Sequence, residues 1–112
     1  MGSDPGLYEE SRATIEHILP QGKRARGSWE RDFSAKQLKS FAHRLGNLSL
    51  LEPELNHLLA NRPWAEKRPV FAKSKFALSR ELEDIERWTP AVLLERADRL
   101  VNILLAYWDL EP

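Results

Sequence analysis

The sequence predicts a mostly helical α+β fold, in which a short two-stranded hairpin and the helix after it form a core for additional packing helices. Three observations predict it. Residues 13–19 and 48–50 are short and β-capable. Residues 34–45 and 90–108 carry apolar side chains at helical spacing. The length of 112 residues leaves room for one compact domain.

The first strand is predicted within residues 13–19, where Thr14, Ile15 and Ile18 favour extended structure and Pro20 ends it. Residues 1–11 before it are expected to be a flexible lead-in or residues added for expression, so the folded domain is expected over residues 12–110. Residues 21–27 form a polar, basic loop, and residues 29–33 favour neither helix nor strand.

The next elements follow from their capping residues. Ser34 is a good N-cap for a helix that runs to about residue 45, and Gly46 then suits a left-handed C′ position. Residues 48–50 form the second strand. Pro53 fits the first turn of a short helix that carries Asn56.

Three helical segments are predicted in the second half of the chain. The first runs from residue 64 to about 73, where Pro69 breaks or kinks it, and Ser79 caps a second through residue 85. Thr89 and Pro90 begin the longest, to about residue 108. Its apolar stripe consists of Leu93, Ala97, Leu100, Val101, Leu104, Leu105 and Trp108.

Composition excludes several classes of site. With no cysteine, the chain has no disulfide, no cysteine-based zinc site and no thiol nucleophile. No apolar run approaches the roughly 20 residues that span a bilayer, and no secretory signal is visible, so we expect a cytoplasmic protein without a membrane partner. Residues 22–80 carry 13 Lys/Arg against 5 Asp/Glu, a basic stretch that favours phosphate, although mixed charge also simply solvates helix surfaces.

Four polar residues carry the chemistry of the sequence. Glu16 and His17 are adjacent in an apolar run, and Asn47 and Asn56 follow about thirty and forty residues later. A carboxylate, an imidazole and an amide of this kind can hold one divalent metal ion and activate a water beside it, as a phosphodiesterase requires. The ordinary alternative is a half-buried glutamate and a hydrogen-bonded histidine.

These residues resemble the HNH (ββα-metal, His-Me finger) nuclease motif, and more narrowly the C-terminal domain of GmrSD-type restriction endonucleases. The resemblance covers roughly residues 12–108. Its markers are residues 15–21 and 45–51, Asn56, Asn61, Lys67, Ser74 and Arg96, with Trp88 and Trp108. The resemblance implies that His17 is the general base, that Glu16 and Asn56 bind the metal, and that Asn47 supports the loop that orients the histidine.

Other roles follow from the same resemblance. The metal is expected to be Mg²⁺ or Mn²⁺, which prefer carboxylate and amide oxygens. Double-stranded DNA, modified or foreign, is the expected substrate, and a sensor domain that hydrolyses nucleotides is expected in the same or a partner chain, in bacterial defence against phage. Lys67, Arg68, Lys23 and Arg24 are candidates for phosphate contacts or for solvated surface. Arg96, Asn61 and Ser74 are expected to be structural.

Two rival functions remain open. One is a non-catalytic helical interaction module on a degenerate hairpin, for which the amphipathic last helix and zero net charge are suitable. Against it stands the presence of all four motif residues. The other is an RNA-cutting nuclease on the same hairpin, which competition between substrates would separate from a DNase.

Overall fold

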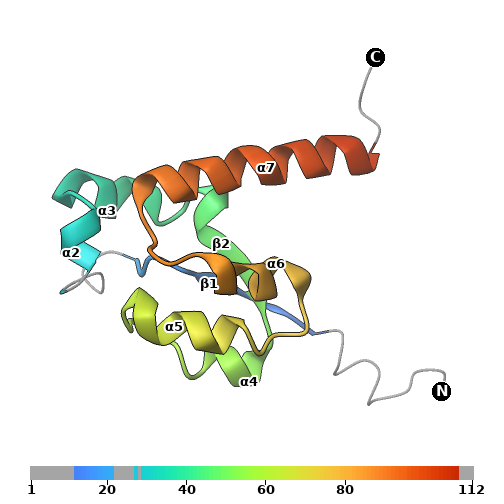
Figure 1. The fold of residues 1–112 in the computed structure, drawn as a ribbon, viewed down its shortest axis with the longest axis horizontal. Coiled ribbons are helices and arrows are strands. Elements are labelled where there is room, and N and C mark those ends of the chain that lie inside the picture. Colours follow the sequence, from blue (N-terminus) through green and yellow to red (C-terminus); the bar gives the residue numbers. More distant parts are fainter. Residues whose placement is uncertain (1–11, 22–26, 28, 109–112) are drawn as a thin grey trace.

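A mostly helical α+β fold is observed, as predicted. The computed structural model describes residues 12–21, 27 and 29–108. A two-stranded hairpin crosses the middle of the molecule, with the long helix α7 on one side of it and the shorter helices α4 and α5 on the other (Figure 1). In chain order the elements, with 3₁₀ helices marked η, are β1 (Thr14–His17), α2 (Trp29–Asp32), α3 (Ala35–Phe41), η2 (Leu45–Asn47), β2 (Leu48–Leu51), α4 (Pro53–Asn56), α5 (Trp64–Phe71), α6 (Ala77–Arg80), η3 (Glu81–Asp84) and α7 (Pro90–Trp108).

The hairpin pairs β1 with β2 antiparallel, and the chain between the two strands holds α2, α3 and η2. Thr14 lies opposite Leu51 and His17 opposite Leu48. Side chains alternate between the two faces, so Glu16 is buried whereas its neighbour Ile15 is 62% exposed. The predicted strands are confirmed at positions close to those expected.

Helix α3 begins as predicted but ends earlier. Ser34 caps it in a full capping box, in which its hydroxyl accepts a hydrogen bond from the amide of Gln37 and its own amide donates to the Gln37 side chain. The helix ends at Phe41 rather than near residue 45. The prediction that Gly46 takes a left-handed conformation is wrong, since Gly46 lies in η2 and is not among the positive-φ residues.

Gly46 is required for space rather than for its backbone angle. A Cβ atom at this position would lie 2.0 Å from the carbonyl oxygen of Leu93 in α7. The η2 turn therefore packs directly against the backbone of α7. No local sequence pattern indicates such a contact, because the two segments are almost fifty residues apart.

The prediction for Ser79 is also wrong. Phe76 is the N-cap of α6, and Ser79 lies inside the helix. Its buried hydroxyl makes tertiary hydrogen bonds instead, a short one to the carbonyl of Leu50 and another of 2.7 Å with the hydroxyl of Ser49. The helical path then continues as η3 rather than as one helix. Ser79 thus joins α6 to β2.

The proline signals are reliable guides to the helices. Pro53 occupies the first turn of α4, and Pro90 begins α7, with the hydroxyl of Thr89 accepting from the amide of Val92 at 3.3 Å. Pro69 lies inside α5, which ends two residues later at Phe71. The predicted segment to residue 73 is thus shortened by two residues.

The core lies between the hairpin and the helices and is rich in aromatic side chains. Its buried members are Ile18, Leu19, Trp29, Phe33, Leu51, Leu59, Trp64, Phe71, Leu82, Trp88 and Leu93. Trp64 and Trp88 pack with ring centroids 5.2 Å apart.

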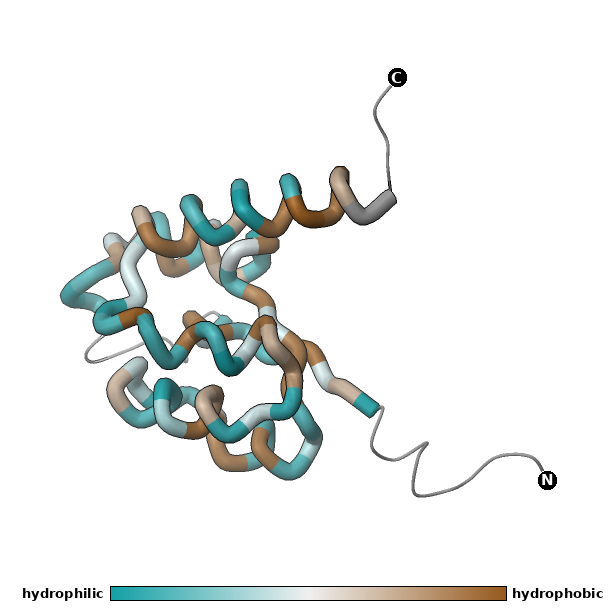
Figure 2. The backbone as a smooth tube through the Cα atoms, turned by 45° about the vertical axis from the view of Figure 1, so that its right-hand side comes forward, coloured by the Kyte–Doolittle hydropathy of each residue, from teal (hydrophilic) through white to brown (hydrophobic). Residues whose placement is uncertain are grey.

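Among the side chains that the structure describes, only the part of α7 up to Leu100 is buried against the rest of the molecule. Leu93 is fully buried and Leu100 is 7% exposed, but Val101, Leu104 and Leu105 are 41–45% exposed. The last turns of α7 extend past the body of the molecule, and Figure 2 shows hydrophobic residues continuing along them. The predicted apolar stripe therefore packs in its first part, whereas Val101, Leu104 and Leu105 remain exposed. Within the described residues, no helix is both long and apolar enough to cross a membrane.

Candidate active site at the end of strand β1

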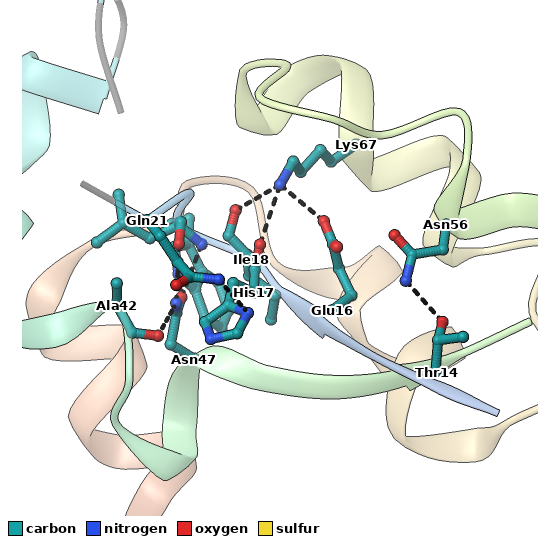
Figure 3. A network of polar contacts seen from close by, with 11 residues as sticks. Thr14, Glu16, His17, Ile18, Gln21, Ala42, Asn47, Asn56 and Lys67 are labelled. Carbon is teal, nitrogen blue, oxygen red and sulfur yellow. Dashed lines mark hydrogen bonds and ion pairs between the residues drawn. The ribbon is translucent and has the colours of Figure 1, made fainter. Parts of the chain in front are cut away.

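The end of β1 brings together most of the polar residues that the sequence singles out. Glu16 and His17 are the last two residues of the strand. Because neighbouring strand residues point to opposite faces, the Glu16 carboxylate and the His17 imidazole leave β1 in different directions (Figure 3). The two side chains thus lie on either side of one strand end.

The carboxylate of Glu16 faces α5, where it forms a buried ion pair with Lys67. The Lys67 ammonium donates to Glu16 Oε2 at 2.9 Å and also to the carbonyl oxygens of His17 at 3.1 Å and Ile18 at 2.8 Å. Lys67 is 0% exposed. One ammonium group therefore holds both the side chain of Glu16 and the backbone that leaves the strand.

Burial and pairing act in opposite directions on this ion pair. Burial raises the pKa of Glu16 above its ordinary value, whereas the charge and hydrogen bond of Lys67 and the backbone amide of His17 lower it. For Lys67, burial lowers the pKa and the interaction with Glu16 raises it. Each charge is thus costly to bury and depends on the other, as is usual for buried ion pairs.

Asn56 lies on the same face of β1 as Glu16. It is the last residue of α4, and its amide nitrogen donates to the hydroxyl of Thr14 at 2.6 Å. Thr14 and Glu16 are two residues apart on one strand and therefore share a face. In Figure 3 the side chains of Asn56 and Glu16 lie on the same side of β1.

The imidazole of His17 is half-buried on the other face. The side-chain amide of Gln21 lies 3.3 Å from its Nδ1, and the ring of His43 packs edge-on with the centroids 5.3 Å apart. Burial first, then the charges of His43 and Lys67, lower the pKa of His17 below its ordinary value. At neutral pH the imidazole is therefore mainly uncharged and can accept a proton.

Asn47 fastens the segment after His17 to its surroundings. Its Oδ1 accepts from the amide of Leu19 at 2.8 Å and from the indole of Trp88 at 3.0 Å. Its Nδ2 donates to the carbonyls of Leu19 at 3.0 Å and Ala42 at 2.8 Å. The backbone carbonyl of Asn47 also accepts from the amide of Ile18 at 2.9 Å. Asn47 is fully buried, and both of its side-chain polar atoms are satisfied.

Of the four candidates for phosphate contact, Lys67 and Arg68 lie in the part of the chain that the structure describes, and Lys67 is buried rather than on the surface. Lys67 is fully buried, so in this conformation its ammonium meets Glu16 and not a phosphate in solution. Arg68 donates to the carbonyl of Glu83 at 2.7 Å and thereby ties α5 to η3. Lys23 and Arg24 lie outside the described residues.

The remaining markers fall at turns and in the core. Ser74 donates to Glu52 at 2.7 Å and accepts from the amide of Phe76 at 3.0 Å, as in a turn. Asn61 is exposed in the turn before α5. Arg96 is 3% exposed, and its guanidinium contacts η2 and β2.

Three contacts of the site are not predicted from sequence. Lys67 is fifty-one positions from Glu16, His43 lies in the turn after α3, and Trp88 is marked only as apolar. Each residue type is compatible with several roles, and only the tertiary fold selects one. A lysine within an otherwise apolar helix face is the only local signal that could indicate the first contact.

The donor set for a metal ion is small. Among the described residues, no group of three or more His, Cys, Asp or Glu side chains is close enough to hold one. Glu16 and Asn56 offer carboxylate and amide oxygens on one face, which fit a hard cation such as Mg²⁺ in kind. Lys67 already uses one oxygen of Glu16.

Comparison with known proteins identifies the family of the chain. The family model described as "GmrSD restriction endonucleases, C-terminal domain" matches residues 2–103. Neither the curated proteins nor the solved structures contain a match. The family match spans nearly the whole chain, so the protein belongs to the family of C-terminal domains of GmrSD restriction endonucleases and is a nuclease-related domain.

Proposed function

We propose that this domain is an HNH-type, metal-dependent DNA endonuclease that hydrolyses phosphodiester bonds. In this proposal His17 is the general base, Glu16 and Asn56 bind one Mg²⁺ or Mn²⁺ ion, and Asn47 supports the histidine segment. The family match supports the coarser statement that the domain is related to restriction nucleases. The residue roles rest on the geometry at the end of β1.

The observation that carries the proposal is the division of these groups between the two faces of one strand end. Glu16 and Asn56 share one face, and the imidazole of His17 leaves the other. In-line phosphoryl transfer needs its base and its leaving-group stabiliser on opposite sides of phosphorus. A phosphate at the end of β1 would have the base on one side and the oxygen donors on the other.

The protein groups then have separate tasks. His17, whose lowered pKa keeps it uncharged, accepts the proton from the attacking water. Lys67 holds Glu16 and the carbonyls after it in place. Asn47 fixes the two residues that follow the base. Glu16 and Asn56 would hold the cation, which would supply charge neutralisation to the phosphate.

The substrate and the context follow from charge and family. Residues 22–80 carry a net charge of +8, from 13 basic and 5 acidic residues, which favours a polyanion. We therefore propose double-stranded DNA, modified or foreign, as the substrate. In this scheme the domain is the effector of a bacterial anti-phage system in the cytoplasm and works with a nucleotide-hydrolysing sensor domain.

Plasmid nicking tests the proposal. The purified chain is incubated with supercoiled plasmid and Mg²⁺ or Mn²⁺, with EDTA in a parallel reaction. We expect metal-dependent nicking that is lost in His17→Ala and Asn56→Ala. His57→Ala is the matched control, because His57 is exposed and directly follows Asn56. It is expected to retain activity.

Three outcomes separate the rival functions. Equal cleavage by His17→Ala would remove His17 from the role of base. Preferential cleavage of RNA in a competition with DNA would change the substrate. No cleavage with either metal by the folded chain, alone or together with the sensor domain, would favour the non-catalytic interaction module.

A further inference from the structure

A buried arginine on α7 reaches the turn that carries Asn47. Arg96 is 3% exposed, and its Nη1 donates to the carbonyl oxygens of Gly46 and Leu48, each at 2.8 Å. These two carbonyls stand on either side of Asn47 in the chain. Weaker contacts of 3.4 Å from Nη2 reach the hydroxyl of Ser49 and the carbonyl of Leu78.

The turn held by Arg96 is the same turn that holds the residues after His17. The backbone and the side chain of Asn47 bind the amides of Ile18 and Leu19 at 2.9 and 2.8 Å. Arg96 therefore holds the two chain neighbours of Asn47, and Asn47 in turn holds the two residues after the proposed base, so the backbone of the turn links Arg96 to that segment. Such supporting groups fix the orientation of a reactive side chain without touching the substrate.

The contact between the turn and α7 leaves little freedom for compensation. A Cβ on Gly46 would approach the backbone of Leu93 to 2.0 Å, so the turn already touches the helix. If the guanidinium is removed, the turn cannot move closer to α7 to recover its carbonyl contacts. Two carbonyl groups would lose their partner, which costs more than the bonds themselves contribute.

The residue type also indicates a specific purpose. A guanidinium can bridge two carbonyl oxygens with its fixed set of donors, whereas a lysine ammonium is a point charge. Burial lowers the pKa of Arg96 to about 10, against the partly opposing charge of Glu81, whose carboxylate is 4.0 Å from Nε. The fold thus retains a buried charge at a cost in stability, in a place where it orders the Asn47 turn.

We propose that Arg96 is a positioning residue of the nuclease site, which acts through Asn47 to hold His17 in its productive orientation. This inference rests on the proposed function for its kinetic consequence, but its structural consequence is independent of that function. Arg96→Met keeps much of the side-chain volume and removes the donors. Arg99→Met is the matched control, because Arg99 lies on the same helix, is half-exposed and pairs with Glu81, and no hydrogen bond joins it to the carbonyls of Gly46 or Leu48 in the described residues.

The structural test is hydrogen–deuterium exchange. In Arg96→Met we expect the amides of Ile18 and Leu19 to lose protection by more than the change in global stability. The amide of Leu38 in α3, which donates to Ser34, should follow global stability only. Arg99→Met should leave Ile18 and Leu19 unchanged. Unchanged protection in Arg96→Met would overturn the proposal whether or not the domain cuts DNA.

The kinetic test separates positioning from loss of fold. We expect Arg96→Met to lower kcat by roughly 100-fold, the effect of misplacing a catalytic group by about 1 Å, with KM for DNA and the activating metal concentration nearly unchanged. A Leu82→Ala variant supplies a stability-matched control, since Leu82 is fully buried in the core. An equal loss of kcat in Leu82→Ala at the same fraction folded would reduce Arg96 to a merely structural residue.

A second variant keeps the test decisive if Arg96→Met does not fold. Trp88→Phe removes the indole donor that contacts Asn47 Oδ1 at 3.0 Å and keeps an aromatic ring in the core. This substitution removes a hydrogen bond to the Asn47 side chain, whereas Arg96→Met removes hydrogen bonds to the backbone on either side of Asn47. Faster exchange at Leu19 together with a lower kcat would support the relay through Asn47. No change in either would contradict it.

Discussion

At the scale of single residues, the structural role of Lys67 depends on its buried ion pair with Glu16. Its ammonium joins α5 to β1 through one carboxylate and two carbonyl oxygens. The side chains of Lys67 and Glu16 are 0% and 11% exposed. The buried Lys67 ammonium, with three oxygen partners, therefore holds the structure of the site together. It also opposes the effect of burial, which raises the pKa of Glu16.

Lys67→Met should destabilise the domain strongly. Removal of one partner leaves the other charge buried without compensation, which typically costs about 3–5 kcal/mol. The double variant Glu16→Gln/Lys67→Met should lose less, because neither charge then remains. Urea unfolding of the wild type, both single variants and the double variant measures the coupling. Additive losses would mean that the two residues do not interact in solution.

The motif residues themselves are visible in the sequence, but this pairing is not. Glu16, His17, Asn47 and Asn56 are recognised by their types and spacing. The pairing of Lys67 with Glu16 and the contact of His43 with His17 are not, because the tertiary fold brings these partners to the strand end from other parts of the chain. Residue patterns therefore predict the candidate catalytic and metal-binding residues better than they predict the residues that contact and orient them.

At the scale of elements, glycine is favoured at two positions for different physical reasons. Gly46 lies where a Cβ would meet the backbone of α7 at 2.0 Å, whereas Gly27 has a φ of 66° and open space around it. Gly46→Ala must push the η2 turn away from α7, at a cost of about 1–3 kcal/mol or more. Gly27→Ala should cost only about 1–2 kcal/mol, because alanine is disfavoured in the left-handed backbone conformation.

The two alanine variants can be distinguished by more than stability. Thermal or urea unfolding measures the loss of stability in each variant. Hydrogen–deuterium exchange of the Ile18 and Leu19 amides measures how firmly the η2 turn holds these residues. We expect faster exchange at these amides in Gly46→Ala only, because the displaced turn carries Asn47 with it. Equal behaviour of the two variants would argue that η2 is not tightly packed against α7.

A carboxylate clamp at the start of α4 gives a pH-dependent contribution to stability. Glu52 accepts hydrogen bonds from the Ser74 hydroxyl and the Lys75 amide, each at 2.7 Å. Burial raises the pKa of Glu52, but these hydrogen bonds and the charge of Lys75 together lower it below its ordinary value. The ionised form therefore stabilises the folded chain above the unfolded-state pKa, and this contribution is lost as pH falls through the folded-state pKa.

Glu52→Gln should consequently be destabilised at neutral pH but not in acid. We expect a loss of about 1.5 kcal/mol near pH 7, at the lower end of the range for hydrogen bonds to charged groups, and this loss shrinks as the pH falls toward about 3. Urea unfolding of wild type and variant across this range measures it. The control is Glu54→Gln, since Glu54 is exposed in the same short helix. A difference that persists in acid would contradict the ionised clamp.

Elements with local signals are the ones that sequence predicts well. Ser34, Pro53 and Pro90 mark helix starts through their own backbone and side-chain chemistry, and the structure places helices there. Gly46 and Ser79 are predicted wrongly because tertiary partners decide their roles. Gly46 touches Leu93 and Ser79 bonds Leu50, and neither partner is near in sequence.

At the scale of the whole molecule, α7 divides into a packed half and a half that extends past the body. Its apolar stripe continues through both halves, so periodicity alone predicts one buried face. The shorter elements beneath it cover only the first part, where Leu93 is 0% exposed, while Leu105 is 45% exposed. The burial of a side chain on α7 depends on how far the neighbouring elements extend along the helix. The spacing of apolar residues in α7 does not give this information.

Two identical substitutions on α7 should therefore differ widely in cost. Leu93→Ala removes a fully buried side chain from the core and should destabilise the domain by about 2–5 kcal/mol. Leu105→Ala, twelve residues further along the same helix, should change the free energy of unfolding by about 0.5 kcal/mol or less, as exposed positions do. The helix propensity change is the same at both positions, so the difference isolates burial.

Urea unfolding, followed by tryptophan fluorescence at two protein concentrations tenfold apart, measures both variants. The unfolding midpoints of wild type and Leu105→Ala should not depend on concentration if α7 ends in solvent, because a monomeric transition has no mass-action term. A large loss in Leu105→Ala, present only at the higher concentration, would show that association covers this end of the helix in solution. A large loss at both concentrations would place Leu105 in the core and contradict the division of α7.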